Sequence, residues 1–279
     1  MTLSFPIEEV QVALTNKRPS IKKPIHQTDW FGINQEEFYL DIPEVGCFYA
    51  KDGNKVSVFP YPEASKESLY LYLHGSVYGA ILHQRKIMPL HGSSFVWQNQ
   101  GILLCGESGA GKSSLTTAFC QDGSKFVSDD VSPILFEENS PQVWALSSRI
   151  KLWKDSLKQL EQSSENLSRI LPDQAKFYFP MPEPSGNKQP LHHILMLEVS
   201  PVKQVQFQPL ESSKKFEALR NEIYRWEFLQ GMPETEAAYL PQLLHLAEST
   251  TITKVLRPRD IPILEMKDVL ERWFIENFT

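Results

Sequence analysis

The sequence predicts an α/β domain with a mixed sheet and flanking helices, preceded by a small β-rich N-terminal region. Three observations support this prediction. An apolar run, Ile102–Cys105, leads into a glycine-rich loop that opens a helix. Residues 87–97 form an earlier strand pattern that turns back onto this run through residues 98–101. Residues 1–62, in contrast, carry only short strand patterns separated by turns.

Length, composition and charge restrict the classes of protein that fit. The 279 residues allow one large domain, or a main domain with an appendage, and we place the boundary between residues 64 and 65. A hydrophobic fraction of 41% and a charged fraction of 22% are typical of soluble globular proteins. The net charge of −6 argues against nucleic acid as the main partner. Residues 1–11 lack a signal core and no apolar run has membrane-spanning length, so we expect a cytoplasmic protein without a membrane partner.

The three cysteines, Cys47, Cys105 and Cys120, lack the spacing of a metal site. Cys105 and Cys120 fall on faces that are predicted to be buried. We therefore expect them to be small core residues.

The N-terminal region carries strand patterns at Phe38–Ile42, Gly46–Ala50 and Lys55–Phe59. Asp52-Gly53-Asn54 predicts a hairpin turn between the last two. This region is either a partner-docking module or a sheet extension packed on the main domain.

A helical segment and a hairpin follow. Ser68–Gln84 has apolar residues at helical spacing, with Ser65 or Ser68 as the N-cap. The strand at 87–97 and the turn at 98–101 predict an antiparallel hairpin with Ile102–Cys105. This lead-in is unusual, because most nucleotide-binding loops begin from a parallel, doubly wound sheet.

Residues 106–113 match the phosphate-binding pattern G-x-x-x-x-G-K-[ST] in full: Gly106, Glu107, Ser108, Gly109, Ala110, Gly111, Lys112 and Ser113. The glycines permit backbone torsions that direct N–H groups at phosphate oxygens, and the helix beginning near Lys112 presents its positive end to the same anion. Lys112 is placed to reach the β- and γ-phosphates and Ser113 to bind Mg²⁺, with Ser114 completing the site. The alternative is a chance glycine-rich turn, which the strand–loop–helix context disfavours.

The next strand, Lys125–Ser128, ends in Asp129-Asp130. Carboxylates at a strand end beside a phosphate loop are placed to hold Mg²⁺, to activate a hydroxyl, or both, and we assign Asp130 to the metal with Ser113. The alternative is a turn-forming pair that caps local backbone N–H groups.

Strand and helix patterns alternate over the rest of the chain. Strands are expected at 133–136, 142–146, 191–199, 202–210 and 251–256, and helices at 155–162, 212–224, 234–248 and 261–278. Arg149, Lys151 and Lys154 cluster around Trp153 at the start of the helix at 155–162. Arg149 and Lys151 are candidates for a clamp on phosphate or on the acceptor, and a solvated charged face is the alternative.

In its hairpin, its glycine-rich loop and its aspartate pair, the chain resembles the catalytic domain of HPr kinase/phosphorylase. It is more closely similar to the HPr-kinase-like proteins found with peptide natural-product biosynthesis, including lasso-peptide kinases. The residues that carry the resemblance are Leu90–Ser93, Gly106–Ser113 and Ser128–Asp130. Weaker support comes from residues 79–85, 149–153, 218–220 with 224–227, and 256–260. The resemblance covers about residue 69 to the C-terminus and implies an HPr-kinase-like P-loop domain.

The resemblance implies transfer of the γ-phosphate of ATP to a serine hydroxyl, with ATP and Mg²⁺ as cofactors. In that family the aspartate pair supplies the catalytic base and a histidine of the hairpin strand lies at the active site. These roles map onto Asp129, Asp130 and His91, with Lys112 as a further catalytic residue. The alternative for His91 is a purely structural residue whose hydrogen bonds are satisfied. The family also makes a homo-oligomer one option.

The chain departs from the family in one segment. HPr kinases carry a Glu-x-Arg-Gly type segment after the aspartate pair, with a magnesium-binding glutamate and a phosphate-facing arginine, and this sequence has none. Ser148–Trp153 occupies a comparable place, and Glu137 and Glu138 are stand-ins for the glutamate. Lasso-type relatives share the Arg-x-Lys-x-Trp pattern, which moves the expected acceptor toward a peptide, a precursor peptide included, or a small-molecule hydroxyl.

Three functions remain open at this point. The leading one is an ATP-dependent serine kinase that acts on a peptide or protein. The second is a nucleotide-gated binding module that transfers no phosphate, and the third is a kinase for a metabolite hydroxyl. An ATPase of the ABC type is disfavoured, because the sequence has no LSGGQ-like signature.

Overall fold

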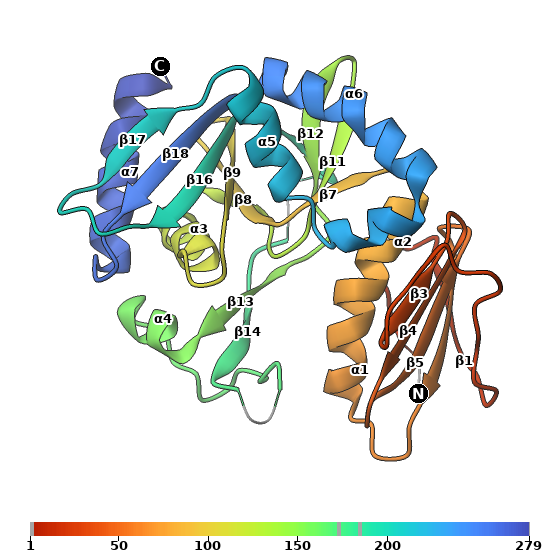
Figure 1. The fold of residues 1–279 in the computed structure, drawn as a ribbon. Coiled ribbons are helices and arrows are strands. Elements are labelled where there is room, and N and C mark those ends of the chain that lie inside the picture. The colour runs from red at the N-terminus through yellow and green to blue at the C-terminus, as the bar shows by residue number, and fades with distance from the viewer. Residues whose placement is uncertain (1–2, 172–173, 184–185, 279) are drawn as a thin grey trace. The chain divides into compact units, whose positions relative to one another are not determined.

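The computed structural model describes residues 3–171, 174–183 and 186–278, which divide into two compact units (Figure 1). The first unit comprises Met1–Pro89 and Ile223–Gln242, and the second comprises Leu90–Glu222 and Leu243–Thr279. This division differs from the expected boundary at residue 64, because the helical segment after it belongs with the N-terminal sheet. Residues 223–242 also belong to the first unit, so a single boundary in the sequence cannot separate the two units.

The first unit contains a six-stranded sheet in the order β1-β6-β5-β4-β3-β2. Its strands are β1 (Gln11–Leu14), β2 (His26–Gln27), β3 (Phe31–Ile33), β4 (Glu37–Ile42), β5 (Gly46–Lys51) and β6 (Lys55–Pro60). The β1–β6 pair is parallel and the other pairs are antiparallel. The three strands expected in this region are confirmed as β4, β5 and β6. Asp52 and Gly53 have φ angles of 55° and 67°, which are the left-handed torsions of a tight hairpin turn.

The expected helix at residues 68–84 is confirmed as three consecutive pieces. These are α1 (Lys66–Tyr72), a π-helical turn η1 (Leu73–Val77) and α2 (Tyr78–Gln84). The Ser65 hydroxyl accepts a hydrogen bond from the Ser68 N–H at 3.0 Å, which satisfies one of the unpaired donors of the first turn. Leu69, Leu73 and Ile81 are buried along one face, so packing as well as capping holds the segment.

The second unit contains a six-stranded mixed sheet in the order β10-β8-β9-β16-β18-β17. Its strands are β8 (Gly92–Trp97), β9 (Gln100–Gly106), β10 (Lys125–Ser128), β16 (His193–Val199), β17 (Gln206–Pro209) and β18 (Thr251–Arg257). The expected hairpin is confirmed as the antiparallel β8–β9 pair, and β7 (Met88–Leu90) is a separate strand that precedes it. Because β10 is antiparallel to β8 and β8 to β9, β10 and β9 run in the same direction. Both strands therefore end at the same edge of the sheet.

Helices α3 (Lys112–Gln121) and α7 (Ile263–Asn277) pack on one face of this sheet. The Phe119 ring of α3 stacks on Phe95 of β8 and on Phe274 of α7, with ring centroids 4.7 and 5.4 Å apart. Such aromatic pairs contribute about 0.5–1.5 kcal/mol each beyond the burial of their surface. This core fixes α3 on the sheet, and with it the loop that precedes the helix.

Smaller elements complete the chain. They are β11 (Ser132–Glu137), β12 (Ser140–Trp144), β13 (Arg149–Trp153), α4 (Lys154–Gln159), β14 (Lys176–Pro180), β15 (Lys188–Pro190), α5 (Ser213–Asn221), η2 (Trp226–Gly231) and α6 (Pro233–Ser249). β11, β12 and β15 form an antiparallel group, and β13 pairs with β14. The basic segment that was expected at the start of the helix at 155–162 is thus the strand β13. Ile150 and Leu152 are its buried residues, and this alternation is the period of a half-buried strand.

The expectations for cysteines and membrane segments can be compared with the described residues. Cys47, Cys105 and Cys120 are free thiols. Cys105 is fully buried, and Cys120 packs at the edge of the core, where burial raises its pKa to about 12. No helix in the described part of the chain is both long enough and apolar enough to cross a membrane.

Candidate functional site

The glycine-rich loop lies between β9 and α3, as the motif predicts, and its backbone requires glycine at two positions. Gly106 has a φ of 130°, and a Cβ atom there would collide with the Leu197 carbonyl oxygen of β16. Gly111 has a φ of 101°, and a Cβ atom there would lie 2.8 Å from Nη1 of Arg257. Gly106 therefore meets a torsional and a steric requirement, whereas the requirement at Gly111 is torsional, because the Arg257 guanidinium is the end of a flexible side chain.

Lys112 is the first residue of α3, and its side chain folds back over the loop. Its Nζ donates hydrogen bonds to the carbonyl oxygens of Gly106 at 2.5 Å and Glu107 at 3.2 Å. Only 8% of the residue is exposed. The ammonium group and the N-terminal end of α3 thus bring positive charge to one small volume, which is the condition for binding an anion.

Asp129 directly follows β10, and the shared edge of β9 and β10 brings its carboxylate to the loop. The Ser113 hydroxyl donates to Oδ1 of Asp129 at 2.7 Å, and the Lys151 backbone N–H donates to Oδ2 at 2.9 Å. Burial and the neighbouring Asp130 charge raise the pKa of Asp129, and the two hydrogen bonds oppose that rise. The predicted proximity of the aspartate pair to the loop is therefore present through Asp129.

Asp130 lies between the Lys151 ammonium group and the His91 ring. Lys151 Nζ donates to its Oδ2 at 2.6 Å, and Nε2 of His91 lies 3.6 Å from its Oδ1. Burial opposes ionisation of this carboxyl, but the Lys151 charge and hydrogen bond, with a smaller contribution from His91, outweigh it and lower the pKa to about 2. Asp130 is therefore ionised at neutral pH. Its φ of 69° is left-handed, a conformation that aspartate tolerates better than most residues.

The two clamp candidates differ in what they contact. Lys151 meets both aspartates, through its ammonium and through its backbone N–H. Arg149, two residues away on the same face of β13, stacks on the Tyr178 ring of β14 at 4.3 Å from the centroid. Glu137 and Glu138 lie at the β11–β12 turn, where Glu137 pairs with Lys188, and among the described residues neither contacts the aspartate pair.

Two further charged residues belong to this region, and neither was among the site residues predicted from the sequence. Lys176 of β14 has a pKa lowered by burial and by the Lys151 and Lys112 charges, against the pull of both aspartates. Glu222 follows α5, and its pKa is raised by burial, which a hydrogen bond from the Gly106 backbone and the Lys112 charge partly offset. The Glu222 carbonyl oxygen also accepts a hydrogen bond from the His91 N–H at 2.7 Å. Both residues come from distant parts of the sequence, so only the fold brings them here.

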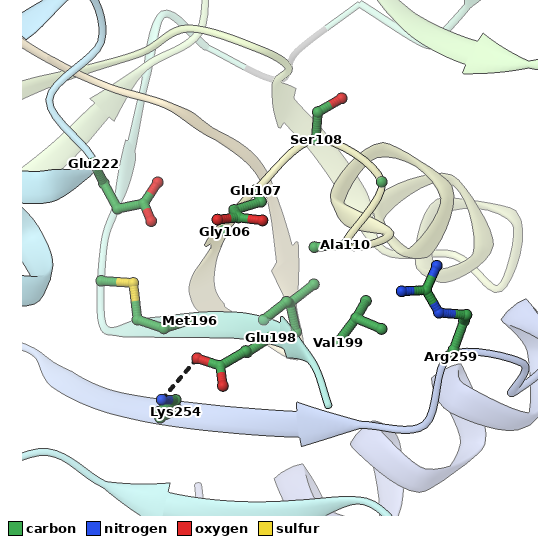
Figure 2. Close-up of a pocket in the computed structure, with 12 residues that line it drawn as sticks. Gly106, Glu107, Ser108, Ala110, Met196, Glu198, Val199, Glu222, Lys254 and Arg259 are labelled. Atoms are coloured by element: carbon green, nitrogen blue, oxygen red, sulfur yellow. Dashed lines mark ion pairs between the residues drawn. The ribbon is translucent and has the colours of Figure 1, made fainter. Parts of the chain in front are cut away.

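A cavity of about 600 Å³ opens beside the first half of the loop (Figure 2). Its walls are loop residues 106–110, the end of β16, Glu222, Lys254 and Arg259. Figure 2 shows the Glu222 carboxyl directed toward the loop, and a Glu198–Lys254 ion pair of 2.7 Å across the opposite wall. The volume is in the range of small-ligand sites, and the lining combines charged residues with the apolar Met196, Leu197 and Val199.

The donors present suit a hard cation better than a soft one. Within the described residues, no group of three or more His, Cys, Asp and Glu side chains is arranged as a metal site. The Ser113 hydroxyl and the Asp129 carboxylate nevertheless place two oxygen donors together beside the loop. Mg²⁺ in phosphate-transfer sites is held by one or two protein oxygens, with water and phosphate oxygens as its other ligands. The set of donors therefore fits Mg²⁺, with Asp129 rather than Asp130 next to Ser113.

Comparison with known proteins gives limited information. No protein-family model matches the chain, and no curated protein shows significant similarity to it. Among solved structures, the chain is similar to the Hpr(Ser) kinase/phosphatase from Coxiella burnetii, with a TM-score of 0.37 and 14% sequence identity. The similarity covers 68% of this chain and 99% of that one. At these values the comparison describes a distant relationship of the fold and no more.

Proposed function

We propose that this chain is an ATP-dependent kinase that transfers the γ-phosphate to a serine hydroxyl of a peptide or protein. The observation that carries the proposal is the hydrogen bond of 2.7 Å from Ser113 to Asp129, next to an ionised Asp130 that Lys151 and His91 hold. It joins the two parts of a phosphotransferase, a phosphate-binding loop and carboxylates at the edge of the same sheet. A chance glycine-rich turn has no reason to meet such a pair.

Each residue has a role that follows from its contacts. The N–H groups of the loop and the Lys112 ammonium bind the terminal phosphates, and Lys112 exchanges the carbonyl groups of Gly106 and Glu107 for phosphate oxygens. Ser113 and Asp129 hold Mg²⁺, which when bound neutralises charge on the β- and γ-phosphates. Lys151 and Lys176 add positive charge on the side where charge develops on the transferred group.

Asp130 orients the acceptor hydroxyl and accepts its proton. A carboxylate with a pKa of about 2 is a weak base, so early removal of the proton is not its main contribution. Phosphoryl transfer through a loose transition state needs little nucleophile activation and depends mainly on position. His91, 3.6 Å from the same carboxylate, holds its orientation.

The test of this proposal is transfer of label from γ-labelled ATP, with Mg²⁺, to serine-containing peptides and to proteins of a lysate. Lys112→Ala should lower the rate of phosphate transfer at least about 10²-fold, because it removes the only lysine within residues 106–113. Asp130→Asn should lower the rate of transfer about 10²-fold, because the carboxylate that orients the acceptor hydroxyl and receives its proton is lost. Transfer by Asp130→Asn at the wild-type rate would exclude Asp130 as the group that receives the proton.

A kinase acting on a small-molecule hydroxyl is the second candidate. It is favoured by the cavity of about 600 Å³ beside Gly106, whose charged lining suits a polar metabolite better than an apolar side chain. A panel of hydroxylated metabolites in the same labelling assay separates the two candidates. Label on a metabolite, with none on peptides or proteins, would favour the second.

A further inference from the structure

A second cavity, of about 560 Å³, lies on the α3 flank of the loop. Gly109 and Arg259 border both cavities, so the two share the loop as a common wall. One wall of the second cavity is apolar and consists of Leu115 of α3 with Ile261, Pro262, Ile263 and Met266 at the start of α7. The first cavity also has apolar residues, Met196, Leu197 and Val199 of β16, but its lining includes the carboxylates of Glu107, Glu198 and Glu222, which would repel a phosphate chain.

The two ends of the loop differ in chemistry, and this difference determines where the rest of a bound nucleotide must lie. The terminal phosphate of the nucleotide has to face the Asp129–Asp130 pair, because the carboxylates and Lys151 lie there. The opposite end of the phosphate chain then leaves the loop at the first turn of α3. At that turn the side chains of Ser113 and Ser114 point in different directions. The Ser113 hydroxyl donates to Asp129, whereas the Ser114 hydroxyl donates to Ser156 at 2.8 Å. Ser114 and Ser156 both line the second cavity.

The segment after β18 is tied to the loop by Arg257. Its Nη1 donates to the Ala110 carbonyl oxygen at 2.9 Å, and its Nη2 donates to the Arg259 carbonyl oxygen at 3.2 Å. The cavity wall and the phosphate loop are therefore held in one arrangement. The same guanidinium lies close to Gly111, where a Cβ atom would be 2.8 Å from Nη1.

Two polar side chains at the rim have donors to offer. The exposed guanidinium of Arg259 donates to none of the described residues and forms no ion pair with them, although it borders both cavities. Gln159 accepts the Ile263 N–H through Oε1 at 3.1 Å, so its amide Nε2 is directed away from that contact. A guanidinium and an amide next to an apolar wall can bind the polar edge of a flat aromatic ring or the oxygens of a sugar phosphate.

We propose that the second cavity binds the nucleoside, a purine base with its ribose, of the nucleotide whose phosphates lie on the loop. Leu115, Ile261 and Met266 contact the base, and Arg259 contacts the oxygens between ribose and phosphate. This inference rests on the proposed nucleotide binding, and it assigns the charged first cavity to something other than the nucleoside.

The test compares two probes, ADP and pyrophosphate, by calorimetry with Mg²⁺ on the full chain. Ile261→Trp fills the second cavity, and Val199→Trp is the matched control that fills the first from a partly buried aliphatic position. Wild type should bind ADP at least about tenfold more tightly than pyrophosphate. Ile261→Trp should weaken ADP binding about tenfold and leave pyrophosphate binding unchanged, whereas Val199→Trp should change neither.

Gln159→Trp fills the same cavity from the exposed end of α4, in case Ile261→Trp does not fold. It gives up one hydrogen bond to the Ile263 N–H but changes no residue of the apolar wall. Equal wild-type affinity for the two probes, or loss of ADP binding in Val199→Trp in place of Ile261→Trp, would overturn the inference. If wild type binds neither probe, the proposed function falls together with it. If Ile261→Trp selectively weakens ADP binding while no acceptor is ever labelled, the nucleoside site stands and the kinase proposal fails.

Discussion

Replacing Lys151 by methionine removes the cation that keeps Asp130 ionised. The lowered pKa of about 2 should then rise to about the ordinary 3.8, because burial, the largest single effect on this carboxyl, is then opposed only by the smaller effects of His91 and Lys176. That rise corresponds to about 2.4 kcal/mol, and since the Asp130 side chain is 31% exposed, solvent screening reduces the expected loss of unfolding free energy to about 1–2 kcal/mol at pH 7. An acid with a lowered pKa stabilises the fold above its unfolded pKa. This contribution is therefore lost between about pH 4 and pH 2.

Two measurements check this prediction. Carboxyl ¹³C NMR should show Asp130 still ionised at pH 3 in wild type, but half protonated at about pH 4 or above in Lys151→Met. Urea unfolding should show the loss of stability in Lys151→Met and not in Lys154→Met, an exposed lysine three residues away. Adding Asp130→Asn to Lys151→Met should recover most of the loss, because no unpaired charge remains. A titration midpoint of Asp130 that stays near pH 2 in Lys151→Met would refute the reasoning. Equal losses of unfolding free energy in the two lysine variants would refute it as well.

Three further predictions follow from other contacts. Asp129→Asn should raise the Mg²⁺ concentration for half-maximal nucleotide binding about tenfold, measured by titration with ADP, and an unchanged Mg²⁺ dependence would remove Asp129 from the metal site. His83 is fully buried with a pKa lowered to about 4, so the unfolding free energy should fall by about 3 kcal/mol as the pH drops from about 6.5 to 4, and His83→Gln should lose most of this dependence in urea titrations. Gly106→Ala should abolish nucleotide binding and lower the melting temperature by more than Gly109→Ala does, because the Gly106 position is closed by the Leu197 carbonyl oxygen whereas nothing lies within 4 Å of the Gly109 position. Equal melting temperatures in the two alanine variants would contradict this steric argument.

The elements predicted well are those specified by residues close together in the sequence. The motif at 106–113 specifies its own strand–loop–helix context, and the turn at 98–101 specifies the β8–β9 hairpin that precedes it. The placement of Asp129 at the loop depends in addition on the antiparallel pairing of β10 with β8, which together with the β8–β9 hairpin brings the ends of β9 and β10 to one edge.

What the sequence could not predict depends on pairing between distant segments. Arg149–Trp153 was expected only as a cationic cluster at the start of the helix at 155–162. It forms the strand β13, and the register of its pairing with β14 brings Lys176 to the aspartates. Glu222 and Arg259 reach the loop from the ends of α5 and β18. Arg259 lies in a segment, and Glu222 next to one, that supported only the family resemblance, and no local pattern places either residue at the loop. The choice between Asp129 and Asp130 beside Ser113 was also beyond the sequence, because adjacent residues differ only in where the chain directs their side chains.

The most direct test of the central claim is transfer of γ-labelled phosphate by wild type and by Lys112→Ala, with Mg²⁺, to serine-containing peptides and to proteins of a lysate. The account predicts label on a peptide or protein with wild type alone, while both forms show the same thermal unfolding. Tight ATP binding by wild type with no label on any peptide or protein, or equal labelling by the two forms, would contradict it.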